Sequence, residues 1–293
     1  MERNWPSLFP VHWINLNRQS TRRLRMQWAL EKGGWTHRRW IAVDAKDPQQ
    51  HFWSIMRPWH RGSALPGLQR INEVESERIT TRAELACLSS WQTLIENLSS
   101  QSSPSGWFLL MEDDVGSSLA CPDAWPINFA QLIKATGPSS LIIQLAPISS
   151  RARYKLYNQW HISKGKSIVI SKKNIRSHGN GAVLLNQKAL PFLRRKVGRW
   201  LETHLPNHHF LTHPYSIRPV ADKWLYGSLP AESSWVCTYP LFCLDANDSN
   251  LHHQHVKDFH IPSRDLTLKL WKDEKANRLL EAFKIWNNYS KDN

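Results

Sequence analysis

The sequence lacks the segments that would mark a membrane-spanning protein, a secreted protein or a small domain stabilised by zinc or disulfides. Its longest apolar runs, Trp107–Met111 and Leu141–Ile143, are far shorter than the ~20 residues that cross a bilayer. The N-terminal segment has no long apolar run after its charges, which argues against a cleaved signal peptide. The cysteines show no CxxC spacing, so neither a zinc module nor a dense disulfide framework is indicated; they are Cys87, Cys121, Cys237 and Cys243. We therefore expect a cytoplasmic protein that is soluble or peripheral to a membrane.

The motifs of dinucleotide-binding proteins and of nucleic-acid-binding proteins are also missing. No GxGxxG follows the first expected strand, which disfavours a dinucleotide cofactor. No RNP, zinc-finger or helix-turn-helix signature accompanies the basic residues, so we expect no specific nucleic-acid partner.

What the sequence has in excess is positive charge. It contains 38 Lys and Arg against 24 Asp and Glu, a formal charge of +14, which biases the surface toward anionic partners. Anionic lipid, phosphorylated glycans and nucleic acid all fit, and the basic pairs are dispersed, so charge alone does not choose. The 16 tryptophans either fill the core or rim a cleft in which they stack on sugar rings.

Hydrophobic periodicity predicts an α/β fold in which strands and helices alternate to about residue 200, as in a largely parallel sheet covered on both faces. Strands are expected at 11–16, 39–43, 107–111, 141–145, 167–170 and 182–185, and helices at 21–32, 81–98, 187–196 and 265–288. We assign residues 8–255 to one domain and residues 256–293 to a C-terminal helical extension.

The strongest chemical signal is the segment LLMEDDV, in which Glu112, Asp113 and Asp114 end a hydrophobic strand. In open α/β sheets, ligands bind beyond the carboxyl ends of the strands. Three adjacent carboxylates repel one another, and a divalent cation, which prefers hard oxygen ligands, reduces that cost. The alternative is a solvated acidic turn.

Other segments extend this pattern in both directions along the chain. They read WINLNRQSTRR at 13–23, IAVDA at 41–45, ELACLSSW at 84–91, FLLMEDDV at 108–115, GNGAVLL at 179–185, PVADKWL at 219–225, and a closing segment at 240–251. In this order they resemble the motifs of glycosyltransferase family 25, the lipooligosaccharide-type sugar transferases. Two positions depart from that family's pattern: Trp91 stands where its helix motif ends in histidine, and Asn180 stands in place of the threonine of its glycine-threonine pair.

The resemblance implies a GT-A-like Rossmann-type sheet and roles for the acidic residues. Asp114 would bind Mn²⁺ or Mg²⁺, and Glu112, which would face the nucleotide ribose, is a second candidate ligand. Asp113 would hold the metal or orient its neighbours.

Basic residues near the first strand are candidates for binding the donor. Arg18, Arg22 and Arg23 follow this strand, where guanidinium groups make paired hydrogen bonds to phosphate; one or two of them could form only a solvated helix face. Asp44, after the second strand, contacts the nucleoside or caps a helix.

Inverting transfer also needs a base that takes the proton of the acceptor hydroxyl. Asp222 occupies the matching family position at the start of an expected helix, where its alternative role is capping; Glu232 is a weaker candidate. The histidine group His252-His253-Gln254-His255, with Asp258 and His260, offers metal ligands or ordinary surface and core residues.

The sequence therefore predicts an inverting hexosyltransferase. It would move galactose or glucose from a UDP-sugar to lipopolysaccharide or another surface glycan, with contact to an anionic membrane at its inner face. The alternative is a noncatalytic basic module of the same fold that binds anionic membrane or nucleic acid.

Overall fold

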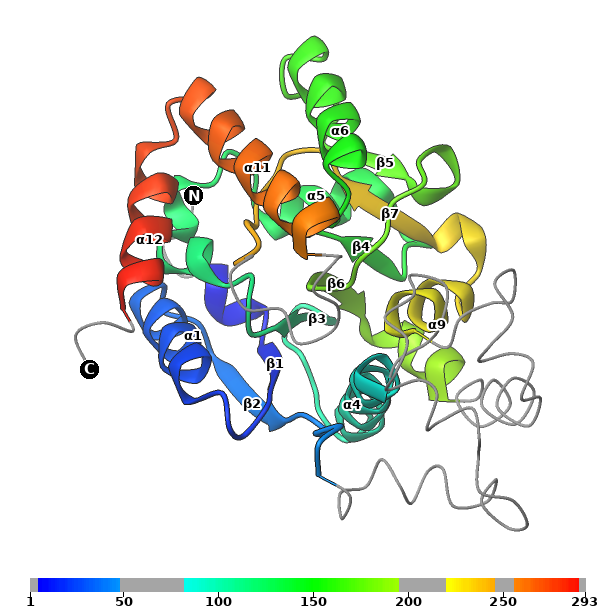
Figure 1. Cartoon of the computed structure of the whole chain (residues 1–293). Helices are drawn as coiled ribbons and strands as arrows, with labels where there is room; N and C mark the ends of the chain where they lie inside the picture. The colour runs from blue at the N-terminus through cyan, green and yellow to red at the C-terminus, as the bar shows by residue number, and fades with distance from the viewer. Residues whose placement is uncertain (1–4, 48–81, 195–219, 246–255, 290–293) are drawn as a thin grey trace.

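The protein is built around one seven-stranded sheet (Figure 1). The computed structural model describes residues 5–47, 82–194, 220–245 and 256–289. The strands are β1 (Val11–Asn15), β2 (His37–Ile41), β3 (Trp107–Glu112), β4 (Ile142–Gln144), β5 (Val169–Ser171), β6 (Ala182–Asn186) and β7 (Ser234–Cys237). The helices are α1 (Ser20–Lys32), α4 (Arg82–Leu98), α5 (Phe129–Thr136), α6 (Ser150–Ile162), α9 (Ala221–Gly227), α11 (Ile261–Asp273) and α12 (Asn277–Asn288).

The strands lie in the order β2-β1-β3-β6-β4-β7-β5. β1 pairs in parallel with both β2 and β3, and β4 pairs in parallel with β7. β6 runs antiparallel between β3 and β4, and β5 runs antiparallel to β7. The predicted α/β class with a flanked Rossmann-type sheet is confirmed. The expected parallel pairing holds for β2-β1-β3 and for β4-β7, whereas β6 and β5 run antiparallel to their neighbours.

Side chains alternate across the sheet and bury both of its faces. Along β3, Trp107, Leu109 and Met111 pack into one core with residues of α1, α5, α11 and α12. Phe108 and Leu110 point into a second core with residues of α4 and α9. This double burial explains why the strands read as continuous apolar runs.

Two helix predictions need correction. The single terminal helix expected at 265–288 is two helices, because the chain turns at Lys275, which has a φ of +56°. The helix expected at 187–196 opens with a 3-10 turn, Gln187–Ala189, and remains helical to residue 194. α12 packs its buried face, including Phe283 and Trp286, into the first core, so the C-terminal segment shares the core of the sheet. The division at residues 255 and 256 stays a prediction.

The helices of the described ranges show no membrane-crossing segment. None of them combines the length and the apolar character that a transmembrane helix needs.

Candidate functional site

A cavity of about 830 Å³ opens at the carboxyl ends of β1, β2 and β3. β1 lies between β2, the next strand in the chain, and β3, so the strand order reverses at β1. In open α/β sheets, ligands bind in the crevice beyond the carboxyl ends of the strands at such a point. Because β6 is antiparallel, its first residues and the preceding glycine turn meet the same edge of the sheet. The N-terminus of α9 forms another wall. The volume is typical of small-molecule sites.

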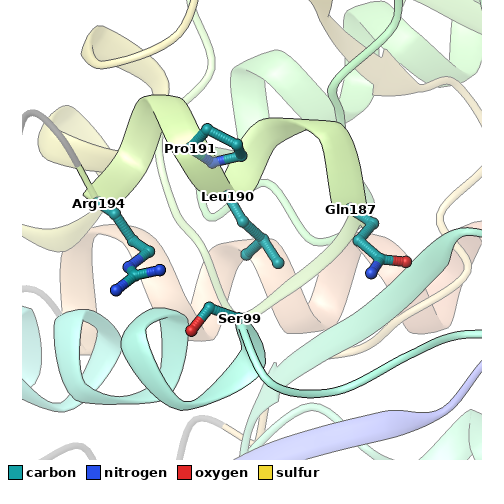
Figure 2. A pocket seen from close by; sticks show the side chains of 5 residues that line it. All are labelled: Ser99, Gln187, Leu190, Pro191 and Arg194. Carbon is teal, nitrogen blue, oxygen red and sulfur yellow. The ribbon is translucent and has the colours of Figure 1, made fainter.

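A second hollow of about 550 Å³ lies at the opposite end of the sheet, after the last residue of β6 (Figure 2). Its lining is Ser99, Gln187, Leu190, Pro191 and Arg194. No carboxylate is among these residues, in contrast to the larger cavity, which Glu112, Asp113, Asp114 and Asp222 line.

Asp113 is held in place by two donors. The Asn15 amide donates to Asp113 Oδ2 at 2.5 Å, and the buried Arg22 guanidinium donates to Oδ1 at 3.1 Å. Arg39 Nε in turn donates to Asn15 Oδ1 at 2.9 Å. Burial opposes the charged form of Arg22, but Asp113, Asp114 and Asp245 together outweigh it and raise the Arg22 pKa. Asp113 therefore acts as an anchor between β1, α1 and β3.

Asp114 is in the opposite situation. Its residue is 9% exposed, it lines the cavity, and its Oδ1 has no hydrogen-bond partner among the described residues. Burial, with Glu112, Asp113 and Asp245 close by, raises the pKa of Asp114 to about 8 although Arg22 opposes this. A buried carboxylate oxygen without a donor is costly, and a cation at that oxygen would remove the cost. Asp114 therefore fits the predicted role of metal ligand.

Glu112 turns one oxygen toward protein donors. Trp91 Nε1 and Asn180 Nδ2 donate to Glu112 Oε1 at 3.1 and 3.0 Å, and Cys87 Sγ lies 3.6 Å from the same atom. Burial raises the pKa of Glu112. The two positions that depart from the family pattern thus meet at one carboxylate oxygen, and Trp91 supplies a hydrogen bond where histidine is missing. These donors orient Glu112, so of the two predicted ligands Asp114 is the one whose oxygen lacks a partner in the described chain.

Of the residues predicted to bind the sugar donor, Arg18, Arg22 and Asp44 line the cavity and Arg23 does not. Arg18 Nε pairs with Asp44 Oδ2 at 2.6 Å, and both residues line the cavity together with Arg22. Burial raises the pKa of Asp44, but Arg18 and Lys46 together outweigh it and keep the pKa below its usual value. Arg23 lies on α1 and is not among the residues that line the cavity.

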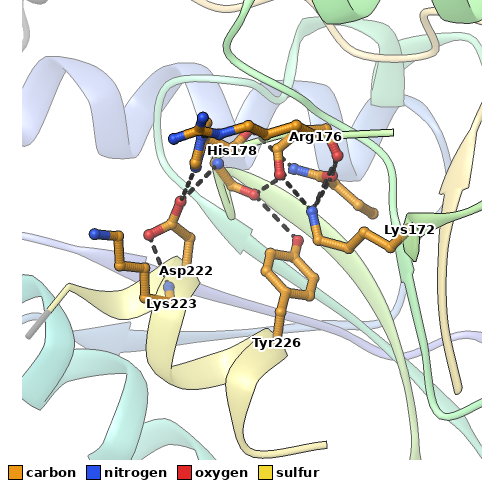
Figure 3. A network of polar contacts seen from close by, with 9 residues as sticks. Lys172, Arg176, His178, Asp222, Lys223 and Tyr226 are labelled. Carbon is orange, nitrogen blue, oxygen red and sulfur yellow. Dashed lines mark hydrogen bonds and ion pairs between the residues drawn. The ribbon is translucent and has the colours of Figure 1, made fainter. Parts of the chain in front are cut away.

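Asp222 lies in the first turn of α9 and lines the cavity. Its Oδ2 accepts a hydrogen bond from the Gly179 amide at 3.1 Å and lies 3.7 Å from His178 Nδ1 (Figure 3). Burial raises the pKa of this carboxyl, but His178 and the Gly179 amide outweigh it and hold the pKa of Asp222 below its usual value. The N-cap of α9 is Val220, so Asp222 is not the capping residue of that helix.

A polar network beside Asp222 fixes the turn that carries His178 (Figure 3). Gln144 Nε2 donates to the carbonyl oxygens of His178 and Gly179, and the Tyr226 hydroxyl donates to the second of these. Lys172 donates to Gln144 Oε1 at 2.9 Å and lies 3.9 Å from the centre of the Tyr226 ring. Burial lowers the pKa of Lys172 to about 8. Three segments of chain, β4, the turn after β5 and α9, therefore position one glycine turn.

We expect Gly179→Ala to lower the free energy of unfolding by ~1–3 kcal/mol, because this position has a φ of +101° and a new Cβ would lie 2.7 Å from Ile148 Cγ2. Denaturant unfolding measures the change. Gly227→Ala is the control, since nothing lies within 4 Å of its Cβ position, and it should change stability by less than ~0.5 kcal/mol. Equal effects of the two substitutions would contradict this account of the turn.

The remaining candidates are placed less centrally. Glu232 is exposed, pairs with Lys173 at 3.0 Å and does not line the cavity. His260 is buried and lines the cavity, whereas Asp258 is exposed. The group at 252–255 lies outside the described residues. Within the described ranges, no group of three or more His, Cys, Asp or Glu side chains converges as a complete metal site would.

Three residues that contact the acidic residues of the site were not candidates in the sequence analysis; they are Asn15, His178 and Asp245. Asn15 could have been found, because it ends the first strand at the edge where the ligand is expected. His178 precedes the glycine turn but shows no motif of its own. Asp245, whose amide donates to the Asp114 carbonyl oxygen at 2.6 Å and whose carboxylate pairs with Arg25, had no local signal because its partners are far away in sequence.

Comparison with known proteins gives a distant structural similarity. The chain matches no family model, and no curated protein matches it. Among solved structures it is similar to the apo form of mouse xyloside xylosyltransferase 1, with a TM-score of 0.35 and 9% identity, over 77% of this chain and 83% of that chain. At this level of similarity, the assignment of function depends on the site itself.

Proposed function

We propose that this protein is a glycosyltransferase that transfers a hexose from a UDP-sugar with inversion. The observation that carries the proposal is Asp114, a buried carboxylate whose Oδ1 has no protein partner in the described chain, at the end of β3 in a cavity of about 830 Å³. Its neighbours Asp113 and Glu112 are already held by protein donors. The ordered resemblance to glycosyltransferase family 25 supports the same assignment.

The carboxylate oxygens in the cavity suit a cation that also binds the diphosphate of the substrate. Mg²⁺ and similar ions are commonly held by one or two carboxylates plus substrate phosphates, so one free carboxylate in the cavity is compatible with this mode. When bound, the cation offsets the charge that develops on the departing diphosphate. Asp114 would hold it, with Glu112 as the second candidate, while Arg18 and Arg22 bring positive charge to the cavity wall.

In the proposed reaction, the acceptor hydroxyl oxygen forms a bond to the anomeric carbon of the sugar. The bond from that carbon to the diphosphate oxygen breaks, and its electron pair leaves with the diphosphate. The hydroxyl proton passes to a base on the opposite face of the sugar, for which Asp222 is our candidate. Asp222 comes from α9 and Asp114 from the end of β3, so the two carboxylates reach the cavity from different elements.

The acceptor we propose is lipopolysaccharide or another surface glycan, and the sugar is galactose or glucose; both follow from the family resemblance. A glycolipid acceptor would bring the protein to the inner face of the cytoplasmic membrane, where its formal charge of +14 favours anionic lipid.

The second candidate is a noncatalytic module that uses the same charge to bind anionic membrane or nucleic acid. The charge excess alone favours it, whereas the arrangement around Asp114 and Asp222 favours an enzyme.

Turnover of UDP-galactose or UDP-glucose separates these candidates. We expect UDP release in the presence of Mn²⁺, with loss of turnover after EDTA and recovery when Mn²⁺ is restored, because the cation balances charge in the transition state. UDP formation is measured by coupled assay and the product by mass spectrometry. A protein that binds anionic vesicles but never consumes a UDP-sugar would support the noncatalytic module.

A further inference from the structure

The positive charge of this protein comes from one part of its chain. Between residues 124 and 201 there is no Asp or Glu, and the basic residues of this segment account for the whole excess over acidic residues. They are Lys134, Arg151, Arg153, Lys155, Lys164, Lys166, Lys172, Lys173, Arg176, Lys188, Arg194, Arg195, Lys196 and Arg199. Elsewhere, basic and acidic residues balance. The basic pairs are dispersed along the chain, but the excess of basic over acidic residues lies within residues 124–201.

Within this segment, α6 gathers basic and apolar side chains on its outer face. Arg151, Tyr154, Lys155 and Ile162 follow spacings of three, four and eleven residues, which place them on one side of a helix. All four are exposed, while Leu156 on the opposite side is buried. The outer face of α6 therefore carries two basic and two apolar side chains in a stripe along the helix, which we call the outer stripe.

The end of α6 adds to this stripe. Ile162 is 78% exposed and Tyr154 is 54% exposed, unusual values for large apolar side chains. Lys164 and Lys166 follow directly and are exposed. Figure 1 shows α6 projecting at the top of the molecule. An exposed aliphatic side chain on the same stripe as lysines suits the interface of a bilayer, where the apolar group enters and the ammonium groups meet headgroups.

The acidic groups that act on α6 include Asp273 and Glu274 at the C-terminal end of α11, which both add to burial in raising the pKa of Tyr157. Glu274 accepts a hydrogen bond from the Tyr157 hydroxyl and lies 3.8 Å from His161 Nδ1, on the side of α6 that faces α11. Glu232 pairs with Lys173, which lies beyond β5. The outer stripe itself carries no acidic residue.

We propose that the outer face of α6, extended by Lys164 and Lys166, is the surface on which this protein docks to an anionic lipid bilayer. Nucleic acid also attracts lysines, but its phosphate backbone gains nothing from an exposed isoleucine, whereas a bilayer interface does. Ser149, the N-cap of α6, lines the large cavity, so a membrane along the stripe comes to the edge of the candidate site. The proposal stands on charge and exposure and does not depend on the transferase activity.

The test is vesicle cosedimentation with the full chain, on phosphatidylcholine alone and on phosphatidylcholine with phosphatidylglycerol. We expect binding to the acidic vesicles only, decreasing with salt because of screening. Lys155→Glu/Lys164→Glu should reduce partitioning at least ~20-fold, since each basic residue near such a surface contributes about fivefold. Ile162→Ser should weaken the binding that persists at higher salt.

Lys32→Glu/Lys284→Glu is the matched control, because it changes the net charge equally at exposed positions on α1 and α12. It should retain most of the binding. Equal losses in both pairs would mean that total charge, not this surface, binds the vesicles, and would overturn the proposal. So would wild-type protein that ignores acidic vesicles, or an α6 pair that loses affinity for single-stranded RNA but not for vesicles. Melting temperatures within about a degree of the wild type would show that both pairs remain folded.

Discussion

Asp222→Asn is expected to reduce turnover by ~100-fold or more while UDP-sugar affinity stays nearly unchanged. A base acts on the acceptor proton in the transition state, so its removal lowers the rate without removing a contact that the bound donor makes. Asparagine preserves the shape of the side chain and can still accept from the Gly179 amide. Donor affinity is measured by calorimetric titration, and turnover at saturating acceptor.

His178→Ala distinguishes two ways in which Asp222 could act. The pKa of Asp222 lies below its usual value, so the carboxylate is ionised at neutral pH but is a weak base, and its Oδ2 faces His178. If Asp222 takes the proton itself, His178→Ala retains most of the turnover. If Asp222 orients His178, both variants fall together. Normal turnover in Asp222→Asn would exclude Asp222 from proton transfer, and loss of donor binding would assign it to the sugar-binding wall.

Asp114→Asn should abolish the Mn²⁺-dependent part of UDP binding. The substitution removes the charge of the cavity carboxylate whose Oδ1 lacks a protein partner in the described chain, and it hardly changes side-chain volume. Calorimetry with UDP, with and without Mn²⁺, measures the loss. Unchanged Mn²⁺-dependent affinity would remove Asp114 from the metal site and would undermine the proposed function.

The same variant should be more stable than the wild type without metal. The pKa of Asp114 is raised from 3.8 to about 8 on folding, mainly by burial, so the folded state holds its proton more tightly than the unfolded state. The wild type therefore loses stability as pH rises from about 4 to about 8, and Asp114→Asn avoids that loss. Thermal unfolding should give a higher Tm for the variant at pH 8 and nearly equal values at pH 4. A variant that is less stable at pH 8 would show that Asp114 has a protein partner.

The sequence predicted those elements whose signal is local. The apolar run that becomes β3 and the helix that becomes α1 lie where periodicity placed them, because burial of one face or both is written into neighbouring residues. Strand direction was not predictable in the same way. The apolar run of β6 reads alike in either direction, and its antiparallel pairing depends on the route of the chain between β5 and β6.

Sequence alone determined that three carboxylates end a buried strand, that a glycine turn precedes β6, and that the chain has a large basic excess. Only the tertiary structure decided how the three carboxylates differ. Asp113 takes its donors from β1 and α1, Glu112 takes its donors from α4 and the turn before β6, and Asp114 keeps an oxygen that no described residue satisfies. The physical reason is that hydrogen bonding and burial set the charge of each carboxylate and decide which of its oxygens lacks a donor. The residues that supply them come from segments as far as 98 residues apart in the chain.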